Sequence, residues 1–165
     1  MTGPALLLLD RDGTLMEDVG YPNDPEQVRL LPGAAEAIRE LVADGFVPAV
    51  VSNQSGLARG LITPAQAEAV HARFVERFEA ASGVRLTCYY CPHGPDDGCD
   101  CRKPRPALLR RAIADLGMTG VSGAMVGDKL SDVEAGEAIG FRGLLFRGDW
   151  PATTAAIRTL FGETS

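Results

Sequence analysis

The sequence predicts an α/β fold, a doubly wound parallel sheet with helices on both faces. Two observations support this prediction. Strand-like apolar segments alternate with helix-like segments along the chain, which is typical of parallel sheets built with crossover helices. The first strand, residues 6–9, consists of four consecutive leucines, and such a run is typical of a strand buried on both faces.

The expected elements follow one another in a regular order. The helices are bounded by capping residues and glycines, and their apolar residues recur on one face, as Val70, Phe74 and Phe78 do. His71 lies one step off that face, so we expect it to be exposed. The expected strands are residues 6–9, 46–51, 85–90, 123–126 and 143–146. The expected helices are residues 33–41, 64–82, 105–116, 131–140 and a short one from Trp150.

Polar residues stand where three of these strands end. They are Asp10 and Asp12 after the first strand, Ser52 and Asn53 after the second, and Asp128 after the fourth. These ends can meet only if the second and fourth strands flank the first. The sequence therefore predicts the strand order 3-2-1-4-5, which puts the first strand at the switch point where ligands bind in open α/β sheets.

The two acids after the leucine run are the centre of the expected site. Side chains alternate along an extended chain, so Asp10 and Asp12 are expected on one side and Arg11 on the other. Two carboxylates this close fit a bound divalent cation, or a nucleophile beside a proton carrier. A solvated Asp-rich turn is the structural alternative. The long segment 15–32 that follows, rich in Gly and Pro, is either a rim that selects the substrate or a surface connection.

Composition limits the class of protein. With 165 residues, 45% of them apolar, and 23% charged, the chain is expected to form one soluble domain over residues 1–165. A net charge of −6 argues against nucleic acid or an anionic membrane as the main partner. No targeting or membrane-spanning segment is visible, so a cytoplasmic location is expected. The chain is also expected to be a monomer.

A short stretch, residues 91–101, carries potential zinc ligands. Cys91, His93, Cys99 and Cys101 offer three thiolates and one imidazole, which is a full tetrahedral set for a structural zinc ion. A reduced cluster or disulfides are the alternatives. Cys88 is expected to be a core thiol instead. The zinc loop would brace the residues that come directly after it, Arg102 and Lys103.

The acids at the strand ends also suit Mg²⁺. Asp10, Asp128 and the backbone carbonyl of Asp12 would hold the ion, because hard cations prefer oxygen ligands. Ser52 and Lys103 would bind the other oxygens of a phosphate. This arrangement fits phosphoryl transfer to or from a small phosphorylated metabolite.

The combination of Asp10-Arg11-Asp12-Gly13-Thr14, Ser52-Asn53, Lys103 and Gly127-Asp128-Lys129 resembles the four motifs of the haloacid dehalogenase (HAD) superfamily. The resemblance implies that Asp10 is the nucleophile and forms an aspartyl-phosphate, and that Asp12 is the general acid and base. Ser52 and Lys103 would hold the transferring group, and Asp128 would anchor Mg²⁺. A receiver-type phosphoacceptor domain is the rival from another class, but it does not explain Asp12.

The zinc loop narrows the resemblance to a subgroup of HAD phosphatases that act on a heptose bisphosphate or on histidinol phosphate. The motifs around residues 53–60, 89–93 and 125–129 favour the former, whereas the short gap between His93 and Cys99 is more like the latter. The gaps between motifs leave no room for a large cap domain. By this resemblance the substrate site is lined by Asp18, Val19, Gly20, Tyr21, Ser52, Asn53, Gln54, Ser55, Arg102, Lys103 and Lys129.

Overall fold

The computed structural model describes residues 3–162. Its strands are β1 (Ala5–Leu9), β2 (Phe46–Asn53), β3 (Thr87–Cys91), β4 (Gly123–Gly127) and β5 (Arg142–Leu145). Its α-helices are α1 (Ala34–Ala43), α2 (Pro64–Ser82), α3 (Ala107–Asp115), α4 (Leu130–Ala138) and α5 (Trp150–Leu160), and a short 3-10 helix, η1, spans Pro25–Gln27. Strands and helices alternate as the sequence predicts, and element boundaries differ by one or a few residues.

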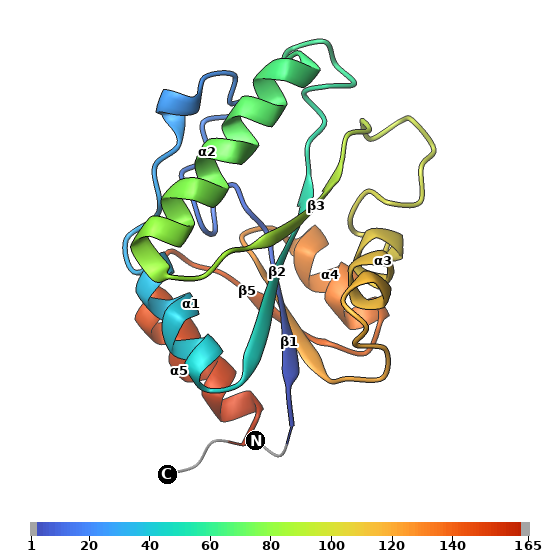
Figure 1. Cartoon of the computed structure of the whole chain (residues 1–165). Coiled ribbons are helices and arrows are strands. Elements are labelled where there is room, and N and C mark those ends of the chain that lie inside the picture. The colour runs from blue at the N-terminus through green and yellow to red at the C-terminus, as the bar shows by residue number, and fades with distance from the viewer. Residues whose placement is uncertain (1–2, 163–165) are drawn as a thin grey trace.

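The sheet confirms the predicted topology. All strand pairs are parallel, and the order is β3-β2-β1-β4-β5. β1 lies in the middle of the sheet between β2 and β4, with Leu8 opposite Ala49 on one side and Met125 on the other. Figure 1 shows the twisted sheet between its two helical layers.

The leucines of β1 divide the core into two layers. Leu7 and Leu9 pack in a cluster with residues of α1, α2 and α5, whereas Leu6 and Leu8 pack with residues of α3 and α4. All four leucines are fully buried. The four-leucine run therefore has the structural meaning predicted for it, since each face of β1 needs apolar side chains.

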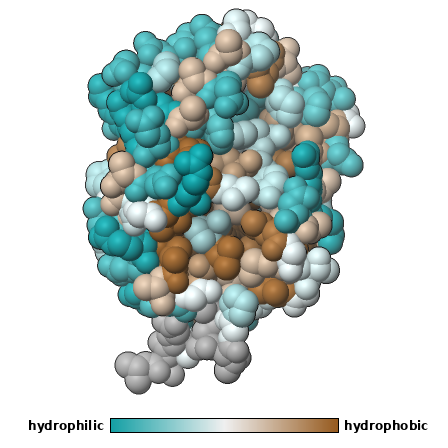
Figure 2. Space-filling model, viewed as in Figure 1, coloured by the Kyte–Doolittle hydropathy of each residue, from teal (hydrophilic) through white to brown (hydrophobic). Residues whose placement is uncertain are grey.

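Hydrophilic and hydrophobic residues are unevenly distributed on the molecular surface. Figure 2 shows hydrophilic residues over the upper left of the viewed face, around α2, and hydrophobic residues gathered in its lower middle. Within residues 3–162, no helix is both long enough and apolar enough to cross a membrane.

Two local differences from prediction affect the site. β2 continues to Asn53, so Ser52 and Asn53 are its last residues and not the start of a loop. The segment 15–32 is not featureless, because η1 begins at an Asp24 capping box and Met16 bridges to Leu30. Three residues of this segment, Asp18, Gly20 and Tyr21, line the same cavity as Asp10 and Asp12.

Candidate active site

Lys103 is the buried centre of the candidate site. Its side chain is 1% exposed, and its Nζ donates to Asp10 Oδ1 at 3.0 Å, to Asp132 Oδ1 at 2.5 Å and to the Val51 carbonyl at 2.7 Å. An ammonium has three donors, so all of them are used. Burial opposes the charge of Lys103, but the carboxylates of Asp10 and Asp132 outweigh it and raise the pKa of Lys103. The lysine is therefore a permanent cation at the end of β1.

The backbone of Lys103 is fixed by an amide at the end of β2. Asn53 Oδ1 accepts from the Lys103 N–H at 3.0 Å, and Asn53 Nδ2 donates to the Lys103 carbonyl at 3.2 Å. The sequence predicts Asn53 as a substrate contact, and it does line the same cavity as Lys103. Because both ends of its amide hold the backbone of Lys103, its structural effect is to position the lysine.

Three acids converge beside this lysine. Asp10, Asp128 and Asp132 each offer a carboxylate oxygen, and these oxygens all lie within 4.8 Å of one another. Burial and the negative charge of Asp10 raise the pKa of Asp128 to about 6, and the same two causes raise the pKa of Asp132. Such mutual repulsion is relieved when a cation binds between the carboxylates.

A metal ion fits this arrangement. Asp128 Oδ1 is buried and has no hydrogen-bond partner among residues 3–162, which is costly for a carboxylate unless a cation satisfies it. Gly13, at φ +82°, approaches so closely that a Cβ there would collide with the Asp128 carboxylate. The donor set consists of carboxylates, which are the ligands that Mg²⁺ prefers.

Asp132 is an acid that sequence analysis missed. It is 1% exposed, and its carboxylate accepts from Lys103 Nζ and, at 3.1 Å, from the backbone N–H of Lys129. A Cβ on Gly127 would collide with this carboxylate, so glycine is needed at the end of β4. The available signal was an acid in the first turn of a helix that follows Gly127-Asp128, but the same pattern is common as a simple helix start.

Asp12 is held differently from Asp10. Its carboxylate accepts from Arg11 Nε at 2.7 Å and from Gln54 Nε2 at 3.3 Å, and Gln54 Nε2 also donates to Ser52 Oγ at 2.9 Å. The expectation that Arg11 points away from Asp12 was wrong. β1 ends at Leu9, and strand alternation no longer applies to the residues that follow.

A polar cavity of about 490 Å³ is lined by Asp10, Asp12, Lys103 and Asp132, among other residues. Of the predicted substrate residues, Val19 does not line it, and Val19 is 41% exposed. Arg59 was missed by sequence analysis; its guanidinium lies 5.9 Å from the centre of the Tyr21 ring at the cavity. The predicted residues that line the cavity are Asp10, Asp12, Asp18, Gly20, Tyr21, Ser52, Asn53, Gln54, Ser55, Arg102, Lys103 and Lys129.

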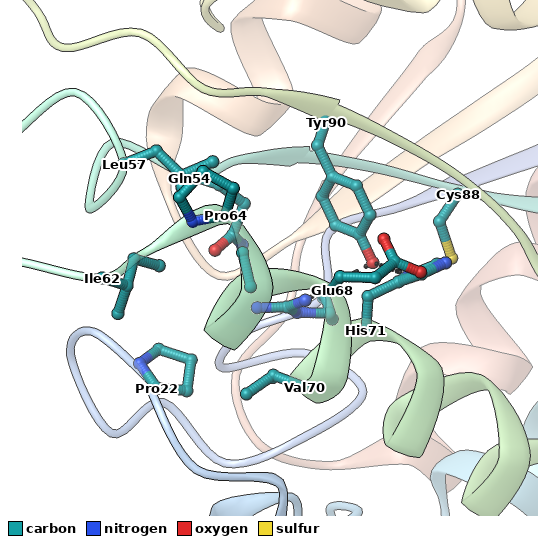
Figure 3. Close-up of a pocket in the computed structure, with 12 residues that line it drawn as sticks. Pro22, Gln54, Leu57, Ile62, Pro64, Glu68, Val70, His71, Cys88 and Tyr90 are labelled. Carbon is teal, nitrogen blue, oxygen red and sulfur yellow. Dashed lines mark hydrogen bonds between the residues drawn. The ribbon is translucent and has the colours of Figure 1, made fainter.

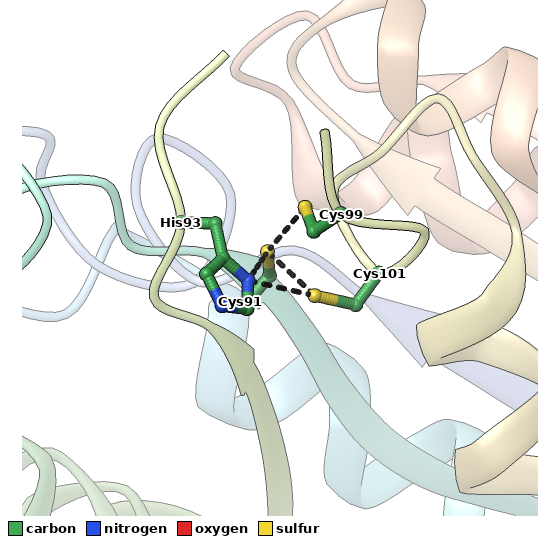
Figure 4. A group of neighbouring side chains, drawn as sticks. All are labelled: Cys91, His93, Cys99 and Cys101. Carbon is green, nitrogen blue, oxygen red and sulfur yellow. Dashed lines mark hydrogen bonds between the residues drawn. The ribbon is translucent and has the colours of Figure 1, made fainter. Parts of the chain in front are cut away.

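The cysteine loop brings its four expected ligands together (Figure 4). Cys91 Sγ lies 3.8 Å from Cys99 Sγ and 3.6 Å from His93 Nδ1, and Cys101 Sγ lies 2.9 Å from Cys91 Sγ and 3.2 Å from His93 Nδ1. Zinc–sulfur bonds of about 2.3 Å in a tetrahedron put two sulfurs roughly 3.8 Å apart. All four cysteines of the chain are free thiols, and the fourth, Cys88, is partly buried apart from this cluster. The Cys91–Cys99 pair matches this spacing and the Cys91–Cys101 pair is closer, and three thiols with one imidazole are the donor types that zinc prefers.

Comparison with known proteins agrees with the geometry. A sequence profile described as HAD-hydrolase-like matches residues 100–156. Over 144 residues the chain is 44% identical to the D-glycero-beta-D-manno-heptose-1,7-bisphosphate 7-phosphatase of Pseudomonas putida, in an alignment that covers 86% of this chain and 82% of that enzyme. The chain belongs to the HAD phosphatase family. It is thus an enzyme that hydrolyses phosphate esters, as the motifs predict, and not a receiver-type phosphoacceptor.

Other relatives agree with this membership. The 7-phosphatase of Escherichia coli K12 with the same name is 41% identical over 140 residues, which cover 80% of this chain and 73% of that enzyme. The crystal structure of a D,D-heptose 1,7-bisphosphate phosphatase from B. bronchiseptica, complexed with magnesium and phosphate, matches with a TM-score of 0.77 and 35% identity over 93% of this chain and 86% of that one. This HAD phosphatase carries no large cap domain within its described residues.

Proposed function

We propose that this HAD phosphatase removes the 7-phosphate of D-glycero-β-D-manno-heptose 1,7-bisphosphate. The observation that carries the proposal is the 44% identity with a 7-phosphatase for this substrate over 86% of the chain. The size and polarity of the cavity support it, because a sugar bisphosphate needs room for a polar body and cations for two phosphates. Arg59, Arg102, Lys103 and Lys129 line the cavity.

Asp10 is the proposed nucleophile. Its carboxylate oxygen attacks phosphorus in line, so that a phosphorus–oxygen bond forms to Asp10 while the bond to the sugar oxygen breaks. Asp12 gives its proton to the leaving sugar oxygen. In the second step Asp12 takes a proton from water, the water oxygen attacks phosphorus, and the bond to Asp10 breaks to release inorganic phosphate. The Lys103 ammonium, 3.0 Å from Asp10 Oδ1, forms an ion pair with the nucleophile and holds it in place.

Mg²⁺ is the proposed cofactor. Asp10 and Asp128, with the backbone carbonyl of Asp12, would hold the ion, while Asp132 stays paired with Lys103. The buried Asp128 oxygen, without a hydrogen-bond partner in the described part of the chain, supports this assignment. When bound, the ion supplies positive charge to the oxygens of the transferring phosphoryl group.

The substrate assignment is tested by comparing kcat/KM for phosphate release from heptose 1,7-bisphosphate and from histidinol phosphate. We expect a preference for the heptose of about a hundredfold, or roughly 2.7 kcal/mol of transition-state stabilisation. The two substrates differ in the number of phosphates as well as in the carbon skeleton, because histidinol phosphate has a single phosphate. Heptose 7-phosphate, a heptose with one phosphate, is therefore the matched control for the number of phosphates. A preference for histidinol phosphate would reject the heptose assignment and leave the phosphatase chemistry in place.

Magnesium affinity is expected to fall in acid. The pKa of Asp128 is raised to about 6, so below that pH the proton must leave before the carboxylate can ligate a metal ion. The dissociation constant for Mg²⁺, measured by calorimetry at pH 5.0, 6.0 and 7.5, should rise about tenfold per pH unit below 6 and change little above 7. An affinity that is the same at pH 5.0 and pH 7.5 would contradict this expectation.

Zinc is the proposed structural metal of the loop 91–101, within a chain that works as a single domain. Cys101→Ser removes one ligand two residues before Lys103, and Cys88→Ser is the matched control outside the cluster. Elemental analysis should find one zinc per chain in the native protein and in the control, and none in Cys101→Ser. We expect KM of the zinc-free variant to rise about tenfold, because Arg102 and Lys103 lose their support. An unchanged KM in verified zinc-free protein would reject the bracing role.

A further inference from the structure

We propose that Arg11 is a positioning residue that orients Asp12 for proton transfer, and that Tyr90 and His71 hold Arg11 in place. The inference rests on the proposed function, in which Asp12 is the general acid and base. It adds three residues that the phosphatase motifs do not assign. They come from the end of β1, from β3 and from α2.

The contact between Arg11 and Asp12 fixes both oxygens of the carboxylate. Arg11 Nε donates to Asp12 Oδ1 at 2.7 Å, and Arg11 Nη2 lies 3.4 Å from Asp12 Oδ2. Arg11 is 3% exposed, and the Asp12 side chain is 16% exposed. A planar guanidinium that meets a carboxylate through two parallel contacts restricts the rotation of that carboxylate. Asp12 therefore reaches the cavity with a fixed orientation.

Two aromatic side chains, Tyr90 and Phe74, pack against the guanidinium of Arg11. Its guanidinium carbon lies 5.2 Å from the centre of the Tyr90 ring and 6.0 Å from that of Phe74, within the range of cation–π attraction. Arg11 Nη1 also lies 3.4 Å from the Tyr90 hydroxyl. The guanidinium is thus fixed by two rings and two polar partners.

His71 completes this chain of contacts. Its Nδ1 lies 2.7 Å from the Tyr90 hydroxyl, and the two rings meet edge to face with their centres 5.2 Å apart. Burial lowers the pKa of His71, which favours the neutral ring. Figure 3 shows Tyr90 and His71 side by side at one end of a cavity of about 290 Å³, with Leu57 and Ile62 at the other end. Arg11 lines this cavity too, and Gln54 lines both this cavity and the active site.

Stability alone does not explain an arginine at this position. The chain around it buries leucines, and a buried ion pair is often no more stabilising than apolar residues of similar size. Asp12 is the carboxylate through which Arg11, Tyr90 and His71 are connected to the active-site cavity of about 490 Å³. The other acid, Asp10, is paired with Lys103 instead. The geometry points to a function at Asp12.

The test compares two leaving groups. A sugar alkoxide must be protonated as it leaves, whereas 4-nitrophenolate is a good leaving group at neutral pH and needs no acid. We use kcat/KM because it reports the steps up to departure of the leaving group and not hydrolysis of the aspartyl-phosphate. Arg11→Met should lower kcat/KM for heptose 1,7-bisphosphate by about ten- to a hundredfold and that for 4-nitrophenyl phosphate by less than about threefold. Arg110→Met, on the exposed side of α3, is the matched control and should change neither.

A double-mutant cycle separates positioning from general damage. In the Asp12→Asn background, Arg11→Met should cause no further loss of kcat/KM on the heptose substrate, because the group that it positions is already gone. Tyr90→Phe keeps the ring and removes the hydroxyl, so it tests the same network should Arg11→Met fail to fold. We expect it to lower kcat/KM three- to tenfold on the sugar phosphate alone.

Equal losses on both phosphate esters, or a full further loss in the Asp12→Asn background, would overturn the role of Arg11. If Tyr90→Phe affects both esters equally or neither, the network is likewise rejected. Failure of the proposed function has a different signature. If the substrate assignment is wrong, the native enzyme itself has a low kcat/KM for heptose 1,7-bisphosphate; if Asp12 is not the general acid and base, Asp12→Asn retains native kcat/KM, whatever Arg11→Met does.

Discussion

Asp10→Asn is expected to lower kcat by at least about 10⁴-fold, because an amide cannot form the aspartyl-phosphate. The substitution keeps the shape of the side chain. Lys103 also keeps its contacts to Asp132 and the Val51 carbonyl, so the variant should fold. Phosphate release from heptose 1,7-bisphosphate at saturating substrate is the measurement, together with a thermal melt.

Asp115→Asn is the matched control for this change, since Asp115 is exposed at the end of α3. It should leave kcat within about twofold of the native value. Trapping of the aspartyl-phosphate offers a second measurement. Native enzyme quenched in acid during turnover should carry a phosphoryl group that alkali removes, and the Asp10→Asn variant should carry none. Full activity in Asp10→Asn, or a phosphoryl group on the variant, would reject Asp10 as the nucleophile.

Lys103→Met is expected to have the largest effect on stability. It removes a cation whose side chain is 1% exposed and leaves Asp10 and Asp132 buried without their partner. Removing one member of a buried ion pair costs about 3–5 kcal/mol. Activity should also fall by about 10²–10³-fold, since Asp10, the proposed nucleophile, loses the cation that lies 3.0 Å from it.

Magnesium should restore part of this stability, because a divalent cation relieves the same carboxylate repulsion. Urea unfolding with and without Mg²⁺ measures both effects. Lys129→Met is the matched control for stability: Lys129 is exposed, and its substitution should change the free energy of unfolding by less than about 0.5 kcal/mol. If Lys103→Met is as stable as the native protein in the absence of metal ions, the ion pairs of Lys103 do not stabilise the fold.

The parts of this protein that sequence predicts well are those set by local patterns. The leucine run and the polar strand ends predict β1 at the centre of the sheet between β2 and β4, and the predicted order 3-2-1-4-5, which brings these strand ends together, is confirmed. The ligands of the cysteine loop lie within eleven residues, so their convergence needs little tertiary information.

Residues that depend on tertiary contacts were harder to predict. In the sequence, Asp132 has the pattern of an ordinary acid in the first turn of a helix. Its ion pair with Lys103, which is 29 positions earlier, is seen only in the structure. His71 was expected to be exposed, but Tyr90 reaches it from β3 and half-buries it. Arg59 lies near Tyr21 across a loop that carries no periodic signal. In each case the partner is distant in sequence, and no local pattern specifies it.

The position of β1 between β2 and β4 also bears on how the protein folds. The parallel neighbours β1, β2 and β3 belong to the first 91 residues, but β4 begins only at Gly123. Asp10 therefore meets Asp128 only after β4 has docked, and contacts of such long sequence separation form slowly. A chain stalled during synthesis before Gly123 would carry the first two acids and Lys103 but lack a competent metal site. Uptake of Mg²⁺ during refolding should accordingly be a late event that reports docking of β4.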